Sequence, residues 1–293
     1  MKILITGANG MVGSSLIPIL KQRNHEVHPT DIIINKNIEA LDVRNYGEIN
    51  KFFGQIKPDI VIHLAAETDV DKCELDPDHA YRTNTMGTMN IVLFCQKYNI
   101  PLLYVSTIGV FDGNKLEPYT EFDNPNPINI YGKSKLEGEK IVIQLLKKFY
   151  IVRAGWMVGG GPDKDKKFVG KIIRILQNTN TVNAVDDKIG SPTFTADLST
   201  CISDLIETGY YGIFHCTNRG IASRYEIAQN IALFLGKDTS NIKPAKSALF
   251  PLPAPRARSE ASINYKLDLM GLNKMRHWKV ALKEYIEDYW KPR

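Results

Sequence analysis

Short apolar runs alternate along this chain with longer segments in which apolar residues recur at helical spacing. Residues 2–6 form a short apolar run ended by glycine, which is typical of a buried strand. Residues 80–98 and 131–149 instead carry apolar side chains three and four positions apart, as on one face of a helix. Further strands are expected at 26–31, 59–64, 101–106 and 150–153. This alternation predicts βαβ units and a parallel sheet.

The second half of the chain has a less regular pattern. Turn signals stand at residues 190–192, and prolines crowd residues 251–255. We therefore expect one α/β unit over residues 1–156 and a smaller, mostly helical lobe over residues 157–293. An apolar run at 212–216 could be a strand that returns to the main sheet, so that the two parts are partly interleaved.

The first expected strand runs directly into a loop with three glycines, Gly7, Gly10 and Gly13. Such glycines allow a tight turn and let backbone N–H groups approach the pyrophosphate of a dinucleotide. Met11 and Val12 lie where the next helix begins, and a helix N-terminus attracts phosphate. Three glycines can also form an ordinary structural turn, but their place at the first strand–helix junction favours a dinucleotide site. The predicted fold is therefore α/β, with a Rossmann-type doubly wound parallel sheet and a smaller C-terminal substrate lobe.

Asp31 ends the second expected strand. An acidic residue at this distance from the glycines hydrogen-bonds the ribose 2′-hydroxyl of the cofactor. A carboxylate there repels a 2′-phosphate, so NADH should be favoured over NADPH. The alternative is an aspartate that only caps a turn.

Two later strand ends could contact other parts of a bound dinucleotide. Asp42 and Val43 follow a likely third strand and could lie over an adenine ring, with the carboxylate accepting from the exocyclic amine. Ala65 and Ala66 end another strand, close to Thr68, and their small side chains would leave room for the nicotinamide ribose and its phosphate. Both segments could instead be ordinary strand-end packing.

Tyr131 and Lys135 are four residues apart in an expected helix, which puts a phenol and an ammonium on one face. A nearby cation stabilises the phenolate and lowers the pKa of a tyrosine, which can then donate the proton that ketone reduction requires. Ser106 and Thr107 end a strand at the edge where α/β sheets place ligands, so a hydroxyl could orient the substrate's carbonyl group. The alternatives are a surface Tyr–Lys pair and hydroxyls that cap the next turn.

Composition narrows the partners and the compartment. The formal net charge of +5, from 37 basic and 32 acidic residues, is too small to predict nucleic-acid binding. We interpret Lys164, Lys166 and Lys167 as a solvated face. The four cysteines form no CxxC pair and the six histidines form no metal motif, so we expect free thiols, no metal site and a cytoplasmic protein. The sequence shows neither a signal peptide nor an apolar stretch long enough to predict membrane insertion.

Several motifs together resemble the dTDP-4-dehydrorhamnose reductase family of the extended short-chain dehydrogenases. Beside the glycine loop, the matching segments are 58–63 with 65–71, 106–107 with 110–113, 127–135, 153–156, and 190–193 with 197–198. The resemblance implies NAD(P)H-dependent reduction of the 4-keto group of a nucleotide-linked deoxysugar. The expected reaction converts dTDP-4-dehydrorhamnose to dTDP-L-rhamnose.

Carried over by position, the resemblance makes Thr107, Tyr131 and Lys135 the catalytic set. It also implies that Trp156 packs against the sugar, with Ser106 as a second contact of the substrate. Two arginines belong to the same picture. Arg153 is expected to help shape the sugar pocket, and Arg256 falls where the family has an arginine near the substrate's phosphates.

Other positions depart from the family. Ile108 and Gly109 stand where it has Asp-Tyr, and Ala257 stands where a proline usually follows the arginine. Some members bridge a dimer through Mg²⁺ with an acid after the glycine loop, whereas this chain has Ser14-Ser15 there. We therefore expect no metal. A homodimer, as in those members, is the expected candidate for an assembly. The open alternatives are a reductase or epimerase of another NDP-sugar, and a non-catalytic dinucleotide-binding regulatory subunit.

Overall fold

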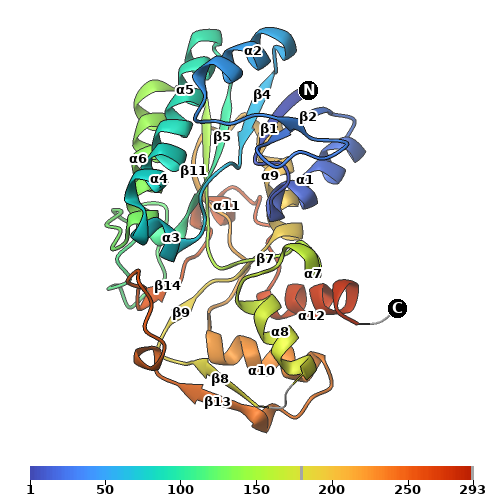
Figure 1. The fold of residues 1–293 in the computed structure, drawn as a ribbon, viewed down its shortest axis with the longest axis vertical. Coiled ribbons are helices and arrows are strands. Elements are labelled where there is room, and N and C mark those ends of the chain that lie inside the picture. The colour runs from blue at the N-terminus through green and yellow to red at the C-terminus, as the bar shows by residue number, and fades with distance from the viewer. Residues whose placement is uncertain (179–180, 292–293) are drawn as a thin grey trace.

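Seven parallel strands form the main sheet of the computed structural model, which describes residues 1–178 and 181–291 (Figure 1). The strands are β1 (Lys2–Thr6), β2 (Glu26–Asp31), β3 (Glu39–Ala40), β4 (Ile60–His63), β5 (Leu102–Thr107), β6 (Phe149–Ala154) and β11 (Gly212–His215). Their order in the sheet is β11-β6-β5-β4-β1-β2-β3. Because the order reverses beside β1, a crevice opens there at the carboxyl ends of the strands. The predicted Rossmann-type fold is confirmed.

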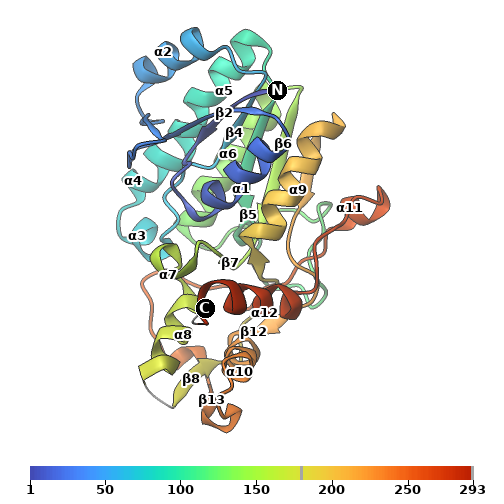
Figure 2. The ribbon, with the colours of Figure 1, turned by 90° about the vertical axis from the view of Figure 1, so that its right-hand side faces the viewer.

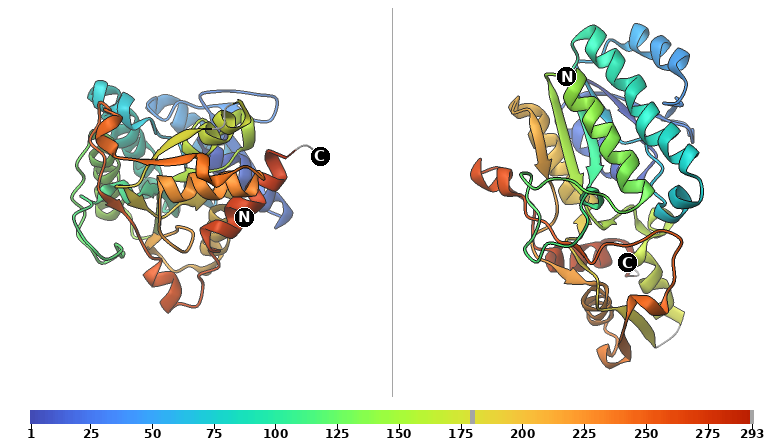
Figure 3. Two further views of the ribbon diagram at one scale, coloured as in Figure 1. Left: turned by 90° about the horizontal axis from the view of Figure 1, so that it is seen from below. Right: turned by 90° about the vertical axis from the view of Figure 1, so that its left-hand side faces the viewer.

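Helices cover both faces of this sheet (Figures 2 and 3). One face carries α1 (Met11–Gln22) and α9 (Thr195–Thr208), which pack against each other. The other face carries α2 (Tyr46–Ile56), α5 (Gly87–Tyr98) and α6 (Ile130–Leu145). The sheet therefore has the two helical layers of a doubly wound fold.

The side chains of β1 show why two apolar layers form. Ile3 and Ile5 are fully buried in the cluster that includes Leu16 of α1 and Leu198 of α9. Leu4 points the other way and is buried in the cluster on the opposite face. A strand buried on both faces reads as a continuous apolar run, which is why the sequence identified it.

The later residues form a second group of elements below the carboxyl ends of the sheet (Figure 1). The helices are α7 (Gly161–Lys164), α8 (Phe168–Asn178), α10 (Arg224–Phe234) and α12 (Trp278–Tyr289), whereas α11 (Tyr265–Leu269) packs on β11 of the main sheet. Three small sheets lie beside them: β7 (Met157–Val158) with β10 (Thr193–Phe194), β8 (Val182–Val185) with β13 (Ile242–Ala245), and β9 (Ile189–Gly190) between β12 (Ala222–Ser223) and β14 (Ser259–Glu260). The apolar run at 212–216 contributes β11, which pairs with β6 in the main sheet.

Two helices differ from the expected bounds. The helix expected over 80–98 consists of the end of α4 (Pro77–Tyr81), a π-helical turn (Arg82–Met86) and α5, and a further short helix, α3 (Val70–Leu75), comes before it. The helix expected over 131–149 ends at Leu145, because β6 begins at Phe149. Helix α1 runs through Pro18, which removes a backbone hydrogen bond without ending the helix. No helix of residues 1–178 or 181–291 combines the length and hydropathy of a membrane span.

Candidate active site

A cleft of about 1560 Å³ runs along the carboxyl edge of the main sheet, between it and the later elements. Its wall contains every residue that the sequence predicts for the site except Gly13 and Arg153. These residues are Gly7, Gly10, Met11, Val12, Asp31, Asp42, Val43, Ala65, Ala66, Thr68, Ser106, Thr107, Tyr131, Lys135, Trp156 and Arg256. The structure thus brings residues from both halves of the chain to one cavity.

The glycine loop fits the diphosphate of a dinucleotide. Gly7 has a φ of +70°, and a Cβ there would lie 2.5 Å from the backbone nitrogen of Ala65. A Cβ on Gly13 would collide with the backbone of Ala8, so this glycine lets α1 start close to the loop instead of lining the cleft. Helix α1 has no side-chain cap at Gly10 and no acidic residue in its first turn. Its first N–H groups are therefore suited to an anionic ligand.

Asp31 makes the turn cap that the sequence left open as an alternative, and its contact with a ribose stays a prediction. One carboxylate oxygen accepts from the backbone N–H of Ile33 (2.9 Å), which is a turn cap. The other accepts from the N–H of Asn9 (2.9 Å), which ties the glycine loop to the end of β2. The residue also lines the cleft, where a ribose is expected.

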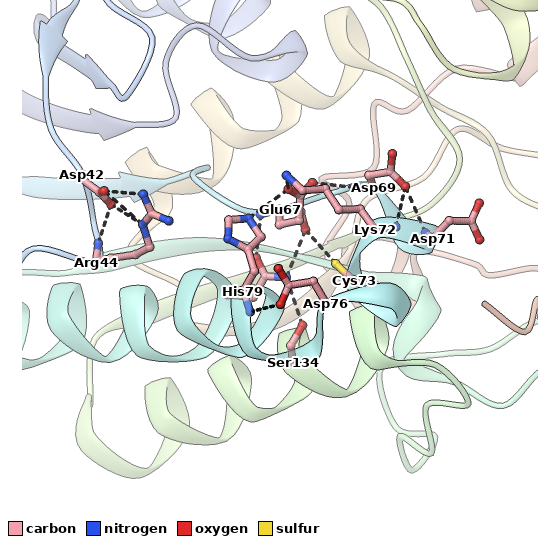
Figure 4. Close-up of polar contacts among 11 residues, drawn as sticks. Asp42, Arg44, Glu67, Asp69, Asp71, Lys72, Cys73, Asp76, His79 and Ser134 are labelled. Carbon is pink, nitrogen blue, oxygen red and sulfur yellow. Dashed lines mark hydrogen bonds and ion pairs between the residues drawn. The ribbon is translucent and has the colours of Figure 1, made fainter. Parts of the chain in front are cut away.

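Asp42 is held by a neighbouring arginine, which the sequence analysis did not consider (Figure 4). The Nε and Nη2 atoms of Arg44 donate to the two carboxylate oxygens of Asp42 at 2.9 and 2.6 Å. These bonds keep the pKa of Asp42 below its usual value. The carboxylate that was expected to accept from adenine therefore already has a partner, although both residues line the cleft.

Thr107 and Tyr131 meet at the carboxyl end of β5. Both side chains line the cleft, and Thr107 Oγ1 accepts from the N–H of Gly109 (3.0 Å). Helix α6 begins next to them, because the side chain of Asn129 caps the N–H of Gly132 (2.8 Å). Ser106 lies beside this pair, and its buried hydroxyl has no hydrogen-bond partner among the described residues. Ser106 lines the cleft, but this hydroxyl itself is closed off from solvent.

Burial dominates the acid–base properties of the pair on α6. It raises the pKa of Tyr131 to about 12, and the neighbouring hydroxyl of Thr107 only partly opposes this. Burial also lowers the pKa of Lys135 to about 7, against the carboxylate of Glu139. The Nζ atom of Lys135 lies 4.1 Å from the ring centroid of Tyr104. The lysine therefore does not by itself give Tyr131 the lowered pKa that the sequence predicts, because both charged forms are desolvated.

Asn84, in the π-helical turn, links the loop after β4 to α6, and the sequence analysis missed it. Its side chain accepts from the N–H of Glu67 (2.8 Å) and donates to the hydroxyl of Ser134 (3.0 Å). The carboxylate of Glu67 in turn binds Lys72 and His79 (Figure 4). One polar residue in an apolar helical pattern gives no sequence signal, yet it fixes the loop with Ala65 and Ala66 relative to α6.

Besides Lys135, six cations on the cleft wall have no carboxylate within ion-pair distance in residues 1–178 and 181–291. They are Lys164, Lys166, Lys167, Lys171, Lys188 and Arg224. The sequence pattern indicated a solvated face for Lys164, Lys166 and Lys167, whereas the structure places all three in the wall of the cleft. A run of charges has the same pattern whether it faces bulk water or a concave site. Unpaired cations there favour a polyanionic ligand.

Trp156, expected against the sugar, already has partners in the protein. Its indole Nε1 donates to Glu260 (2.7 Å), and the guanidinium carbon of Arg224 lies 3.7 Å from the centroid of its ring. Its φ of +38° is left-handed, which costs a residue other than glycine roughly 1–3 kcal/mol. The ring therefore has a fixed orientation in the cleft wall.

The two arginines of the predicted site lie in different environments. Arg256 pairs with Asp71 (2.9 Å), which comes from α3, and the other oxygen of Asp71 accepts from the N–H of Ala254 (3.1 Å). One carboxylate thus ties the segment before β14 to the sheet side of the cleft. Arg153 does not line the cleft and is buried against Glu139, so its expected place in the sugar pocket is wrong.

Known proteins resemble this chain over almost its whole length. A dTDP-4-dehydrorhamnose reductase of Mycolicibacterium smegmatis is 32% identical over 97% of this chain and 85% of its own. A solved dTDP-4-dehydrorhamnose reductase of Clostridium acetobutylicum is 42% identical, with a TM-score of 0.91 over 98% of this chain and 99% of that one. The enzyme of Bacillus anthracis, solved in complex with NADP, is 36% identical, with a TM-score of 0.91 over 98% of this chain and all of its own (100%). The profile of the RmlD substrate binding domain matches residues 1–290, and the chain belongs to this family.

Proposed function

We propose that this protein is an NAD(P)H-dependent reductase that converts dTDP-4-dehydrorhamnose to dTDP-L-rhamnose. One observation carries the proposal: Thr107, Tyr131 and Lys135 line the same cleft as the glycine loop. A proton donor and a dinucleotide site in one cavity are what reduction of a ketone requires. The relatives named as dTDP-4-dehydrorhamnose reductases support this substrate.

Each part of the chain has a separate task in this proposal. The bound nicotinamide cofactor would supply the hydride. The loop at Gly10 would hold its diphosphate at the start of α1, and Asp31 would bind the adenosine ribose. Tyr131 would hold the proton that is delivered to the carbonyl oxygen, and Thr107 would orient that oxygen. Lys135 would bind the nicotinamide ribose.

The unpaired cations support a nucleoside-diphosphate sugar as the substrate. Such a sugar and a dinucleotide each carry a diphosphate, and both would share this cleft. Cations without carboxylate partners can bind the two diphosphates without first breaking ion pairs within the protein. We propose that Arg256 contributes to the substrate's phosphates, and that Trp156 bounds the sugar.

A second candidate substrate is another 4-keto sugar nucleotide. Ile108 is fully buried and Gly109 has no side chain, so neither supplies the polar groups that the family has at these positions. A relative of Streptomyces niveus, 32% identical over 96% of this chain, is named a dTDP-4-keto-6-deoxy-D-glucose reductase. Because of these two observations, the identity of the sugar has to be tested with a panel of substrates.

The deciding experiment mixes the purified protein with NADH or NADPH and a panel of 4-keto sugar nucleotides that includes dTDP-4-dehydrorhamnose. Loss of the reduced nicotinamide absorbance with formation of dTDP-L-rhamnose, identified by NMR, is the expected result. An epimerase would change the sugar without net cofactor oxidation. A regulatory subunit would bind the cofactor and reduce no sugar, and that result would overturn the proposal.

We also propose that NADH is the preferred cofactor, because Asp31 lines the cleft at the end of β2 and its carboxylate would repel a 2′-phosphate bound beside it. The comparison of kcat/KM for NADH and NADPH tests this. In Asp31→Asn the ratio should move towards NADPH, since the repulsion is removed. A wild-type protein that clearly prefers NADPH would show that Asp31 does not set the preference.

Compartment and assembly are parts of the same proposal. All four cysteines are buried free thiols, which supports a cytoplasmic location. A homodimer is a prediction from the family resemblance, and sedimentation equilibrium of the purified protein measures it.

A further inference from the structure

A lysine from the later part of the chain reaches the glycine loop. Lys164, at the end of α7, donates from Nζ to the backbone oxygen of Asn9 (2.8 Å) and to its side-chain oxygen (3.3 Å). Both residues line the cleft, and the contact joins positions 155 residues apart. The loop that fits a dinucleotide is therefore contacted from both halves of the chain.

The backbone conformation of the turn before Lys164 requires glycine at three successive positions. Gly159, Gly160 and Gly161 have φ values of +156°, +77° and +66°, which side chains of L-residues rarely adopt. A Cβ on Gly161 would lie 2.7 Å from the ring of Tyr289. A Cβ on Gly159 would collide with the side chain of Thr195. The three glycines thus let the chain pass tightly against its neighbours where it enters α7.

The same turn is anchored to the helix that starts at the glycine loop. The hydroxyl of Thr195, which packs on Gly159, is hydrogen-bonded to the hydroxyl of Ser15 in α1 (2.8 Å). The other end of the contact is also fixed, because the N–H of Asn9 donates to Asp31. The position of Lys164 over the loop is therefore built by the fold and is not one rotamer of a free surface lysine.

Among the described residues, the ammonium of Lys164 has no ion-pair partner. Its two hydrogen-bond acceptors are neutral oxygens, and among the described residues no carboxylate lies within ion-pair distance of it. An ammonium has three N–H donors, so one remains for a further acceptor. Asp163 also lines the cleft but makes no ion pair with it. A cation in this place favours a phosphate at the start of α1.

We propose that Lys164 is a cofactor-binding residue, whose ammonium binds the dinucleotide diphosphate while it holds Asn9. The inference rests on the proposed function only in that the chain binds a dinucleotide. This role would also explain why α7 lies against the glycine loop. Lys166 and Lys167 follow in the same segment and also line the cleft. A dinucleotide bound to Lys164 would therefore also hold the segment with these two lysines in place.

The test measures cofactor affinity directly, without sugar, by fluorescence titration of the full-length protein with NADH and with ADP-ribose. Lys164→Met should weaken both by on the order of ten-fold, because both ligands contain the diphosphate. It should also make the affinity less dependent on salt, since one charge–charge contact is lost. Lys164→Arg keeps the charge and should bind within about three-fold of wild type.

Lys21→Met is the matched control, because Lys21 lies in the last turn of α1 and outside the cleft. It should bind both ligands as wild type does, and thermal melts should show that all variants are folded. Wild-type affinity in Lys164→Met would overturn the inference, as would a loss for NADH that ADP-ribose does not share. Wild-type protein that binds NADH but reduces no sugar would contradict the proposed function and leave this inference intact.

Discussion

Glu139 and Arg153 form a bidentate ion pair in the core, one helical turn beyond the proposed catalytic lysine. The Nε and Nη2 atoms of Arg153 donate to the two oxygens of Glu139 at 2.9 and 2.6 Å, and both side chains are at most 2% exposed. Tyr131, Lys135 and Glu139 follow at intervals of four residues on α6, so they share a face. The carboxylate therefore supports two cations, one in the core and one at the cleft.

Glu139→Gln should destabilise the protein by about 3–5 kcal/mol, because it leaves the charge of Arg153 buried without a partner. Urea denaturation monitored by circular dichroism measures the change. Glu137→Gln is the matched control, since Glu137 pairs with Lys140 on the surface of the same helix and should cost less than about 1 kcal/mol. Equal effects of the two variants would show that the core pair does not stabilise the fold.

Lys135→Met should stabilise the protein near neutral pH while it removes activity. Burial lowers the pKa of Lys135 from 10.5 to about 7, so between these values the unfolded chain binds a proton that the folded chain does not. Folding is therefore penalised, fully below pH 7 and progressively less as the pH rises to 10.5. The stability advantage of Lys135→Met over wild type should shrink across this window.

Thermal melts of nucleotide-free protein across that pH range measure the effect. Lys133→Met, at an exposed position of the same helix, should follow wild type. A difference between Lys135→Met and wild type that does not change with pH would contradict the depressed pKa.

Tyr131→Phe should lower kcat by roughly 10²–10⁴-fold, because the phenol is the proposed proton donor. NADH binding should stay close to wild type, since the ring and its packing remain. Stopped-flow measurement of NADH oxidation gives the rate, and fluorescence titration gives the affinity. Tyr98→Phe, an exposed tyrosine on α5, should match wild type in both. Unchanged turnover in Tyr131→Phe would exclude the phenol as the proton donor.

Arg256→Ala and Asp71→Asn together separate two roles of Arg256. If Arg256 binds the substrate's phosphates, its removal should raise KM for the sugar nucleotide by about ten-fold or more with a smaller change in kcat. Asp71→Asn breaks the same ion pair but leaves the guanidinium in place, so KM should change much less. Steady-state kinetics at saturating cofactor decides between them. Equal increases of KM would mean that Arg256 serves only to hold Asp71 and its segment.

The parts of the site that the sequence predicts are those set by local spacing. Gly7 and Gly10 follow a strand directly, and Tyr131 and Lys135 are one helical turn apart, so neighbours in the chain determine these geometries. Short apolar runs also predicted most strands of the main sheet, because β1, β4, β5 and β6 are buried on both faces. No such rule applies to Lys164, whose partner lies in the first loop of the chain.

Environment is the other property that the sequence pattern does not contain. The pKa of Tyr131 depends on how completely the folded chain excludes water from it, which spacing does not express. The carboxylate of Asp42 is available to adenine only if Arg44 releases it. Arg153 occupies a family motif position, yet its partner Glu139 holds it in the core. Which of these partners form follows from the folded conformation, and spacing along the chain does not predict it.

The position of β11 at the edge of the main sheet determines which fragments of this protein could fold alone. A fragment that stops at residue 156 would lack β11 and α9, so β6 would expose a row of unpaired N–H and C=O groups, and the apolar side of α1 would lose its cover. Such a fragment would tend to associate through that open edge. Ribosomal synthesis must therefore proceed past His215 before the nucleotide-binding half can close.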